Sequence, residues 1–370
     1  MELKYDIIIS GAGPSGSLLG YLLSLEGIST LIIEKKDFPR YKICAGGLQH
    51  RTLALIPFDM ERVLQRSFNG ILFTYRRRDS FSRKYESPVI YTVDRREFDL
   101  YLAEMAQKKG CTIRFGEKVT GFEYNKTDLI VRTDKNKFRS KILVGADGIR
   151  GVVHRKLIAG RKILKILGYE VEKRCGQSEM EKYQDLVGLD FGGIKKGYVW
   201  AFPKNDIISY GIGGPVNTAR SMKKYFNDYL ESNGRGDNNV MAQCIPIRLE
   251  DTPVHADRVI LIGDAACLGD GFTGEGLYNA FKSSHLACRS IKDALRSSNY
   301  SLNDYAGVID SEIYKDIKVS IAFSRIFYAY PMFFYKLLKS NERFFRLCCQ
   351  VLRGDKKYSD ISGRLKLFNR

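Results

Sequence analysis

The chain has 370 residues, of which 44% are hydrophobic and 28% are charged. This length is enough for about two to three domains, and the composition is that of an ordinary globular protein, which excludes a largely disordered chain or a coiled coil. The 60 Lys and Arg residues exceed the 42 Asp and Glu residues and give a net charge of +18, which favours anionic partners such as nucleic acids, acidic lipid surfaces or phosphorylated ligands.

The cysteine and histidine patterns argue against a metal site. None of the eight cysteines forms a Cys-x-x-Cys pair, and the four histidines are too scattered for a zinc signature. A disulfide framework is unexpected in a chain of this length, which indicates a reducing compartment. The amino terminus has no signal-peptide pattern, and no stretch reaches the ~18 uninterrupted apolar residues of a membrane span. We therefore expect a cytoplasmic protein without a metal.

The first elements form a strand–turn–helix–strand unit. Residues 7–9 are three isoleucines, a run typical of a strand that is buried on both faces. A glycine-rich turn follows, then an apolar helical stretch that ends near Leu25, and a second apolar strand at 30–33. This order predicts the start of a parallel α/β sheet.

The glycine-rich turn has the spacing of a dinucleotide-binding loop. Gly11, Gly13 and Gly16 would permit a tight turn, close approach of the backbone to a pyrophosphate, and tight packing of the helix on the strand. The N-terminus of the helix would then face the phosphates. Glu34 ends the second strand, where a carboxylate accepts hydrogen bonds from an adenosine ribose.

The rest of the chain predicts two kinds of sheet. Residues 95–110 have helical spacing, and short strands are expected at 111–113, 118–124, 129–131, 142–144 and 258–262. Residues 66–91 and 160–248 instead alternate, with many Tyr and Phe residues and turns marked by Gly, which indicates an antiparallel layer. From residue 277 onward the pattern is helical to the end of the chain.

Two Gly-Asp pairs follow apolar strands. Asp147 and Gly148 end one strand and Asp264 ends another, where an Asp faces the ligand crevice and can accept a hydrogen bond from a ribityl hydroxyl. Together with the glycine-rich turn, and in that order, these pairs resemble the FAD-binding segments of the glutathione-reductase and p-hydroxybenzoate-hydroxylase superfamily. Residues 271–277, which include Gly274, would open a helix whose N-terminal dipole stabilises negative charge on a reduced flavin.

Three further segments are similar to the geranylgeranyl reductase family. Residues 42–48 resemble the family's Cys-Gly-Gly loop, residues 95–102 its Arg-x-x-Phe-Asp-x-x-Leu helix start, and residues 197–204 its Tyr-x-Trp-x-Phe-Pro-Lys segment. The resemblance covers residues 6–282. The chain departs from it at Ala45, where many members have Gly, and in its short C-terminal part.

Members of that family are FAD enzymes that saturate C=C bonds of isoprenoid chains. The resemblance therefore implies a flavoprotein oxidoreductase of lipid metabolism that acts on a polyprenyl (geranylgeranyl-type) lipid by hydride transfer from reduced flavin, with NADPH or reduced ferredoxin as the electron donor. It implies that FAD is lined by Ser15, Glu34, Cys44, Ala45, Gly47, Arg95, Val119, Asp264, Gly276 and Leu277. Lys35 and Arg40 are basic side chains that face either phosphate or solvent.

The combined patterns predict an α/β fold with three parts. A Rossmann-like FAD-binding domain with a parallel sheet is expected to be discontinuous, with an inserted antiparallel-sheet substrate domain and a helical C-terminal region. The expected ranges are 1–65, 92–158 and 250–300 for the first part, 66–91 and 159–249 for the second, and 301–370 for the third.

Cys44 is the candidate catalytic residue, as proton donor or flavin-gating group, because its loop would lie near the isoalloxazine ring. The alternative is a buried small hydrophobic residue. Tyr198, Trp200 and Phe202 alternate along an expected strand and share one face, which we interpret as the substrate wall, with Tyr210 in the next segment. Ordinary core packing is the alternative for these residues.

The C-terminal part combines apolar and basic residues. Apolar residues between 323 and 338 recur at near-helical spacing, with Lys and Arg interspersed from 315 to 343. Such a segment can lie on an anionic membrane, which would make the protein peripheral on the inner face of the membrane. Helices that cap the substrate cavity are the other interpretation.

Two other function classes remain open at this point. A flavin-dependent monooxygenase or halogenase uses the same scaffold, although the halogenases have a Trp-x-Trp-x-Ile-Pro segment and residues 198–203 contain one tryptophan. A flavin- or lipid-binding protein without turnover is the third class. The sequence contains no recognised nucleic-acid-binding module, so we expect no nucleic-acid partner.

Overall fold

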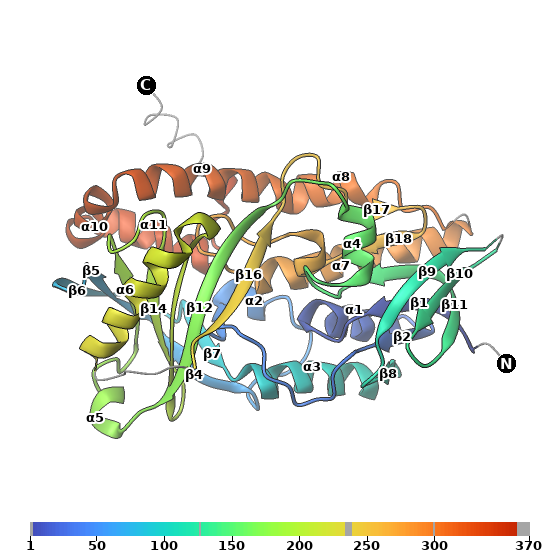
Figure 1. The fold of residues 1–370 in the computed structure, drawn as a ribbon, viewed down its shortest axis with the longest axis horizontal. Coiled ribbons are helices and arrows are strands. Elements are labelled where there is room, and N and C mark those ends of the chain that lie inside the picture. The colour runs from blue at the N-terminus through green and yellow to red at the C-terminus, as the bar shows by residue number, and fades with distance from the viewer. Residues whose placement is uncertain (1–2, 126, 234–238, 299, 361–370) are drawn as a thin grey trace.

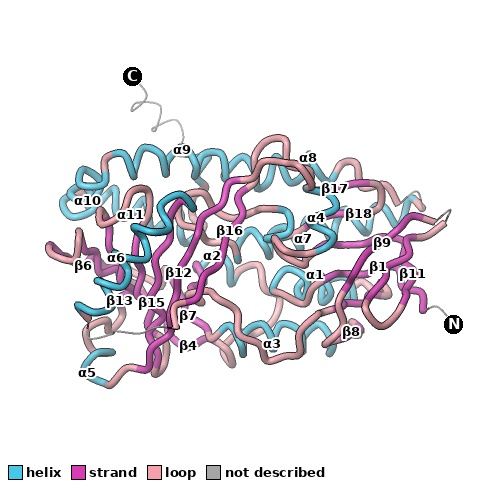
Figure 2. The backbone as a smooth tube through the Cα atoms, in the orientation of Figure 1, coloured by secondary structure: helices cyan, strands magenta, loops and turns pink. Residues whose placement is uncertain are grey.

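The computed structural model describes residues 3–125, 127–233, 239–298 and 300–360. The molecule is elongated, with one large sheet near each end (Figure 1). The C-terminal helices run along one long edge and reach over both sheets (Figure 2). Within the described ranges, none of the helices has the length and apolarity that crossing a bilayer requires.

The first sheet is built around β1 (Leu3–Ser10), whose isoleucine side chains are buried. β1 pairs in parallel with β2 (Thr30–Ile33) and β11 (Lys137–Gly145), and β8 (Thr112–Arg114) and β18 (Val259–Leu261) extend the parallel sheet on either side. Antiparallel strands complete it: β9 (Val119–Tyr124), β10 (Leu129–Thr133) and β17 (His255–Ala256). The predicted parallel sheet of an α/β fold is confirmed.

Helices connect and cover this sheet. α1 (Pro14–Leu25) begins after Gly13 and packs against α3 (Arg95–Lys108) and α7 (Leu277–Ser297). α4 (Val152–Ile158) follows β11. The N-termini of α1 and α4 therefore lie at the carboxyl ends of the parallel strands, where ligands bind in folds of this kind.

The second sheet has seven strands in the order β16–β12–β15–β14–β13–β5–β6. They are β5 (Gly70–Tyr75), β6 (Asp79–Lys84), β12 (Leu164–Arg174), β13 (Leu186–Phe191), β14 (Tyr198–Pro203), β15 (Ile207–Pro215) and β16 (Met241–Ile247). Neighbours are antiparallel as predicted, except that β13 and β5 pair in parallel. The prediction of a purely antiparallel layer was wrong at this pair. The two strands come from separate stretches of chain, so no hairpin imposes antiparallel pairing.

Smaller elements surround the second sheet. A three-stranded sheet consists of β3 (Gly47–Gln49), β7 (Ile90–Val93) and β4 (Leu64–Phe68). The short helices α2 (His50–Leu53) and α5 (Gln177–Met180) lie in the connections. α6 (Ala219–Ser232) packs on one face of the large sheet, and the sequence patterns did not predict it.

The C-terminal helices are α8 (Tyr305–Ile309), α9 (Lys315–Ala329), α10 (Pro331–Ser340) and α11 (Glu342–Arg353). The predicted helical pattern is confirmed over these elements, while residues 361–370 lie outside the described residues. The predicted domain boundaries stay a prediction. The aromatic side chains of α9, α10 and α11 share a buried cluster with those of β5 and β13, so these helices cover the second sheet on the face opposite α6.

Candidate active site

One cavity of about 1250 Å³ joins the two sheets. Its wall includes the carboxyl ends of the first sheet, the loop at residues 40–47, one face of the second sheet, and α9 to α11. The wall brings together residues 10–49 and residues 323–358, which lie near opposite ends of the sequence.

The glycine-rich turn forms one wall of the cavity. Gly11 has a φ of +108°, and a Cβ atom there would lie 2.5 Å from the carbonyl oxygen of Ala146 on the neighbouring strand end. A Cβ atom at Gly16 would lie 2.0 Å from the Gly11 carbonyl oxygen, whereas one at Gly13 would meet nothing nearer than the Arg40 guanidinium at 3.8 Å. Gly11 and Gly16 are thus needed for packing, and Gly13 leaves open space beside the α1 N-terminus, as a bound pyrophosphate requires.

Glu34 is buried beside that turn. Its Oε2 accepts a hydrogen bond of 2.9 Å from the Ala12 backbone N–H, and its Oε1 accepts one of 3.1 Å from the Lys36 backbone N–H. The carboxylate therefore fixes the glycine-rich turn relative to β2 and lines the cavity. Each carboxylate oxygen can accept a further hydrogen bond, which is the chemistry a ribose hydroxyl requires.

The two strand-end aspartates also reach the cavity. Asp147 Oδ2 accepts a 2.9 Å hydrogen bond from the Val153 backbone N–H at the start of α4, while its buried Oδ1 has no hydrogen-bond partner among the described residues. Burial raises the pKa of Asp147. Asp264 Oδ1 lies beside Gly276, the N-cap of α7, at 3.4 Å from the position of a Cβ atom there. Both carboxyls are available to polar groups of a ligand.

The Cys44 loop is held by a buried ionic cluster. Arg95 pairs with Asp99 through two hydrogen bonds, of 2.8 and 3.0 Å, and Arg40 contacts the same carboxylate at 3.2 Å. Burial lowers the pKa of Arg95, but Asp99 and the adjacent Cys44 thiol raise it above its ordinary value overall. The Cys44 sulfur accepts a 3.5 Å contact from the Gly46 N–H. The thiol thus lies beside a permanent positive charge at the cavity wall.

The aromatic face predicted for residues 198–202 lines the cavity. Tyr198, Trp200 and Phe202 all contribute to its wall, and the alternating residues Val199 and Ala201 point into the core on the other face. The Tyr198 hydroxyl donates a 2.5 Å hydrogen bond to the Thr273 carbonyl oxygen, before the N-terminus of α7. The wall of the second sheet is in this way attached to the segment that opens α7.

Tyr210 does not belong to this wall. It is paired with Ala201 across β14 and β15, so it shares the face of Ala201 rather than that of Trp200. Its ring is buried in the cluster under α6, and its hydroxyl hydrogen-bonds to Glu179. The expectation that Tyr210 contacts substrate is corrected for this reason, since the strict alternation of strand residues sends it to the opposite side.

The other predicted residues come together at the cavity, with one exception. Gly16 is packed against the Gly11 carbonyl and does not line it. The cavity-lining residues among those predicted for FAD are Gly11, Gly13, Ser15, Glu34, Lys35, Arg40, Cys44, Ala45, Gly47, Arg95, Val119, Asp147, Gly148, Asp264, Gly274, Gly276 and Leu277. The open space at Gly13 and the unpartnered Asp147 oxygen fit a dinucleotide with hydroxyl groups.

Comparison with known proteins agrees with this geometry. Residues 4–164 match the FAD binding domain family model. The chain is 31% identical over 327 residues to an uncharacterised protein of Methanosarcina barkeri, covering 88% of this chain and 84% of that protein. It is 28% identical over 327 residues to the digeranylgeranylglycerophospholipid reductase of Methanococcus aeolicus, covering 82% and 81% of the two chains.

The chain belongs to the geranylgeranyl reductase family of FAD-dependent oxidoreductases.

Solved structures show the same fold. A geranylgeranyl bacteriochlorophyll reductase-like protein of Thermoplasma acidophilum superposes with a TM-score of 0.78 at 22% identity, covering 88% of each chain. The flavin-dependent brominase Bmp2 also gives a TM-score of 0.78, at 20% identity and with 99% of each chain covered. At these identities the likeness shows the fold alone. It agrees with the expectation that reductases of this family and flavin-dependent halogenases share one scaffold.

The far wall of the cavity in this family member comes from the C-terminal helices. Phe272, which precedes α7, packs against Phe323 and Phe327 of α9 with ring centroids 4.7 and 5.0 Å apart, and Phe327 stacks on Phe334 of α10 at 4.9 Å. All four rings line the cavity. Of the two interpretations of the C-terminal pattern, the structure therefore shows the capping of the cavity. Contact between the outer surface of these helices and a membrane stays a prediction.

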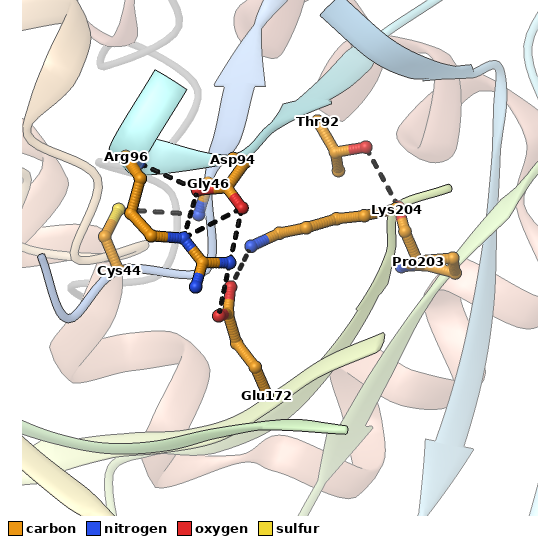
Figure 3. A network of polar contacts seen from close by, with 8 residues as sticks. All are labelled: Cys44, Gly46, Thr92, Asp94, Arg96, Glu172, Pro203 and Lys204. Carbon is orange, nitrogen blue, oxygen red and sulfur yellow. Dashed lines mark hydrogen bonds and ion pairs between the residues drawn. The ribbon is translucent and has the colours of Figure 1, made fainter. Parts of the chain in front are cut away.

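The sequence reasoning missed a group of charged residues beside the Cys44 loop. Glu172 of β12 accepts a hydrogen bond from the buried ammonium of Lys204, and its other oxygen lies 3.6 Å from Arg96, which also pairs with Asp94 (Figure 3). Glu170, two residues before Glu172, lines the cavity itself. The sequence signal for these residues was weak. Glu170 and Glu172 alternate along β12, and the other residues of this strand have the ordinary pattern of a half-buried strand.

A second missed carboxyl is Glu275, in the segment that opens α7. Its Oε1 accepts a 2.8 Å hydrogen bond from the Tyr278 N–H, and it lines the cavity. Burial raises its pKa to about 7, and Arg51 partly offsets this effect. The Gly-Phe-Thr-Gly-Glu-Gly motif was interpreted through its glycines and the helix dipole alone, which left this glutamate without a role.

Proposed function

We propose that this protein is an FAD-dependent reductase that saturates C=C bonds of a polyprenyl lipid with a geranylgeranyl-type chain. The observation that carries the proposal is the continuity of the cavity from the polar glycine-rich turn to the aromatic wall of Phe272, Phe323 and Phe327. Its volume of about 1250 Å³ exceeds the ~300–1,000 Å³ of a typical single-ligand pocket. The relatives named digeranylgeranylglycerophospholipid reductases support the same substrate class.

The residues present fit FAD and divide its binding between them. Gly13 and the α1 N-terminus would hold the pyrophosphate, Glu34 the adenosine ribose, and Asp264 the ribityl chain. When bound and reduced, FAD supplies a hydride. The chain's own groups must then orient the lipid, exclude water from the cavity and provide the proton that completes each reduction.

Cys44 is proposed to act where the flavin ring meets the substrate. It lines the cavity, and the Arg95–Asp99 pair behind it fixes its loop. Tyr198, Trp200 and Phe202 are proposed to contact the isoprenoid chain, because their three aromatic side chains line the cavity from one face of β14.

The test is to purify the protein, record its absorption spectrum, and identify the pigment and any bound lipid by mass spectrometry. We expect a yellow protein with non-covalent FAD, whose dithionite-reduced form is reoxidised anaerobically by a geranylgeranyl lipid. A colourless protein that FAD does not reconstitute would overturn the proposal. Flavin that no prenyl lipid reoxidises would indicate a binding protein without turnover, and peroxide release with NADPH in air would favour a monooxygenase.

The electron donor is a separate part of the proposal. NADPH and a reduced ferredoxin are the two donors to compare, and the net charge of +18 suits either of these anionic partners. The measurement is the rate of flavin reduction by each donor under anaerobic conditions, at low and at high salt.

We also propose that the turn between α9 and α10 touches an anionic membrane. Tyr330, Met332 and Phe333 are 65%, 42% and 51% exposed, an unusual concentration of large apolar side chains within four positions. Lys336 and Lys339 follow on α10. Neighbouring residues of α9 and α10 line the cavity, so contact at this turn would bring a lipid surface close to the aromatic wall.

A further inference from the structure

Glu170 is a buried carboxyl that the proposed contacts with FAD and lipid do not use. It is 2% exposed, lines the cavity, and its Oε1 has no hydrogen-bond partner among the described residues. Glu170 lies on β12 and is paired with Gly211 of β15. Gly211 is in turn paired with Trp200 of β14. Glu170 thus occupies the same row of the sheet as the indole ring that forms the aromatic wall.

The neighbouring cation is committed elsewhere. Lys204 is 1% exposed, and its ammonium hydrogen-bonds to Glu172 (Figure 3). Glu172 is also 3.6 Å from Arg96. Because Glu172 holds both positive groups, Glu170 remains a buried carboxyl without an ion-pair partner, and a buried carboxyl in that position retains its proton to higher pH.

The electrostatics agree with this arrangement. Burial raises the pKa of Glu170 to about 7; Lys204 lowers it, Glu172 raises it, and Ser209 and the Cys44 backbone lower it in part. Titratable and charged groups surround Glu170 from each element that packs against it. They are Glu172 on β12, Lys204 after β14, Tyr41 and Cys44 in the loop at residues 40–47, and Arg96 on α3. A carboxyl with such a pKa is half protonated near neutral pH, which suits a general acid.

We propose that Glu170 is the proton donor of this cavity. The assignment rests on the proposed function, the reduction of a C=C bond. In each reduction the π bond breaks and two C–H bonds form: one carbon receives the hydride that reduced FAD supplies, and the other receives the proton of Glu170. The alkene is reduced, the reduced flavin that supplied the hydride would return to oxidised FAD, and the Glu170 carboxylate regains a proton from solvent before the next turnover.

Other acidic groups of the cavity are less suited to this role. The Tyr198 hydroxyl already donates to the Thr273 carbonyl oxygen, and burial raises its pKa far above neutrality. Within the described part of the chain, Asp147 and Glu275 each keep one unpartnered oxygen, as Glu170 does, but their other oxygen is bound at the start of α4 or α7, and neither lies in the sheet that carries Trp200. The Cys44 sulfur already accepts a contact from the Gly46 N–H and lies beside the Arg95 guanidinium. With Glu170 as the proton donor, Cys44 keeps the other role predicted for it, that of a flavin-gating group.

The first experiment measures the protonation of Glu170 without turnover. Trp200 is the one tryptophan of the chain, so its emission reports the charge of the carboxyl in the same row. In the FAD-free protein we expect an emission change centred near pH 7 that disappears in Glu170→Gln and persists in Glu275→Gln, the control with a similar pKa. In Glu172→Gln the midpoint should move to lower pH, because a negative neighbour is lost and Lys204 is freed to pair with Glu170.

The second experiment is a single turnover. Glu170→Gln should bind FAD and prenyl lipid as the wild type does, but its reduced flavin should be reoxidised by the lipid about 10²–10⁴-fold more slowly, the usual contribution of a general acid. A persisting Trp200 transition in Glu170→Gln, or an unchanged reoxidation rate, would overturn the assignment while leaving the reductase function intact. A wild-type protein that reduces no prenyl lipid would instead overturn the proposed function and, with it, the donor role.

Discussion

The indole ring of Trp200 lies across Gly211, and a Cβ atom at Gly211 would come within 2.1 Å of Trp200 Cζ2. The aromatic wall of the cavity therefore depends on a residue that carries no side chain. The same atom would also meet the Tyr169 backbone oxygen at 2.7 Å, so the backbone cannot move aside to make room.

Gly211→Ala should displace the indole and weaken binding of a prenyl lipid by about tenfold or more, while FAD binding is retained. Its Trp200 emission maximum should shift, because the ring leaves its packed position. Gly168→Ala is the matched control on the same face, since a Cβ atom there meets nothing nearer than 3.7 Å. Equal lipid affinity in the two variants would contradict the prediction.

Glu34→Ala should weaken FAD binding by about 1–3 kcal/mol, the cost of losing a hydrogen bond to a charged acceptor. The variant also loses the hydrogen bonds from Ala12 and Lys36 that hold the glycine-rich turn. The measurement is a titration of the FAD-free protein with FAD, followed by flavin fluorescence. The FAD affinity of Glu34→Gln, which keeps one acceptor oxygen, should lie between those of wild type and Glu34→Ala. An unchanged affinity in Glu34→Ala would refute the ribose assignment.

Cys44→Ser should keep FAD but slow anaerobic reoxidation of the reduced flavin by a prenyl lipid, whereas reduction by dithionite should be nearly unchanged because no substrate is involved. Cys348→Ser is the control, since Cys348 lines the opposite wall of the same cavity. Loss of FAD from Cys44→Ser would mean that the loop is structural, and an unchanged rate in both variants would make Cys44 a bystander.

Glu275 should make stability depend on pH. Burial raises its pKa to about 7 from the ordinary value of 4.5, so the folded state binds its proton more tightly than the unfolded state, and this stabilisation is lost as pH rises from about 4.5 to about 7. Glu275→Gln has no carboxyl at this position, so its stability does not decrease with pH in this way. Its free energy of unfolding relative to wild type should rise by up to about 3 kcal/mol between about pH 5 and pH 8, as measured by denaturant unfolding without FAD. A difference that is constant with pH would contradict this expectation.

Binding to vesicles should require anionic lipid and decrease with salt, because interactions of exposed basic residues are screened beyond ~8–10 Å at physiological ionic strength. The double variant Tyr330→Ser, Phe333→Ser should bind less in a sedimentation assay. Leu25→Ser is the control, because Leu25 is 54% exposed at the end of α1, away from the turn between α9 and α10. Equal binding of wild type to neutral and anionic vesicles, or none to either, would reject the membrane role.

Much of the nucleotide-binding half could be predicted from sequence because its signals are local. The glycines at 11, 13 and 16, the strand before them and Glu34 after them lie within one stretch of chain, and each has a backbone or side-chain requirement that few other residues meet. The same holds for the aromatic face at 198–202, since strand alternation determines which side chains share a face.

The substrate side was harder because its relationships are long-range. Tyr210 was assigned to the wrong face because its register with Ala201 is a property of the paired strands rather than of its own segment. Glu170 was overlooked because nothing local separates it from Glu172. Their different surroundings depend on Lys204, more than thirty positions later in the chain.

The closure of the cavity by α9 to α11 has a consequence for synthesis on the ribosome. The glycine-rich turn and the aromatic strand are made well before Phe323, Phe327 and Phe334, which close the cavity. Until they arrive, the aromatic wall faces water, and the nascent chain exposes the kind of surface that chaperones bind. Shielding of the aromatic wall from water therefore has to wait for the synthesis of α9 to α11.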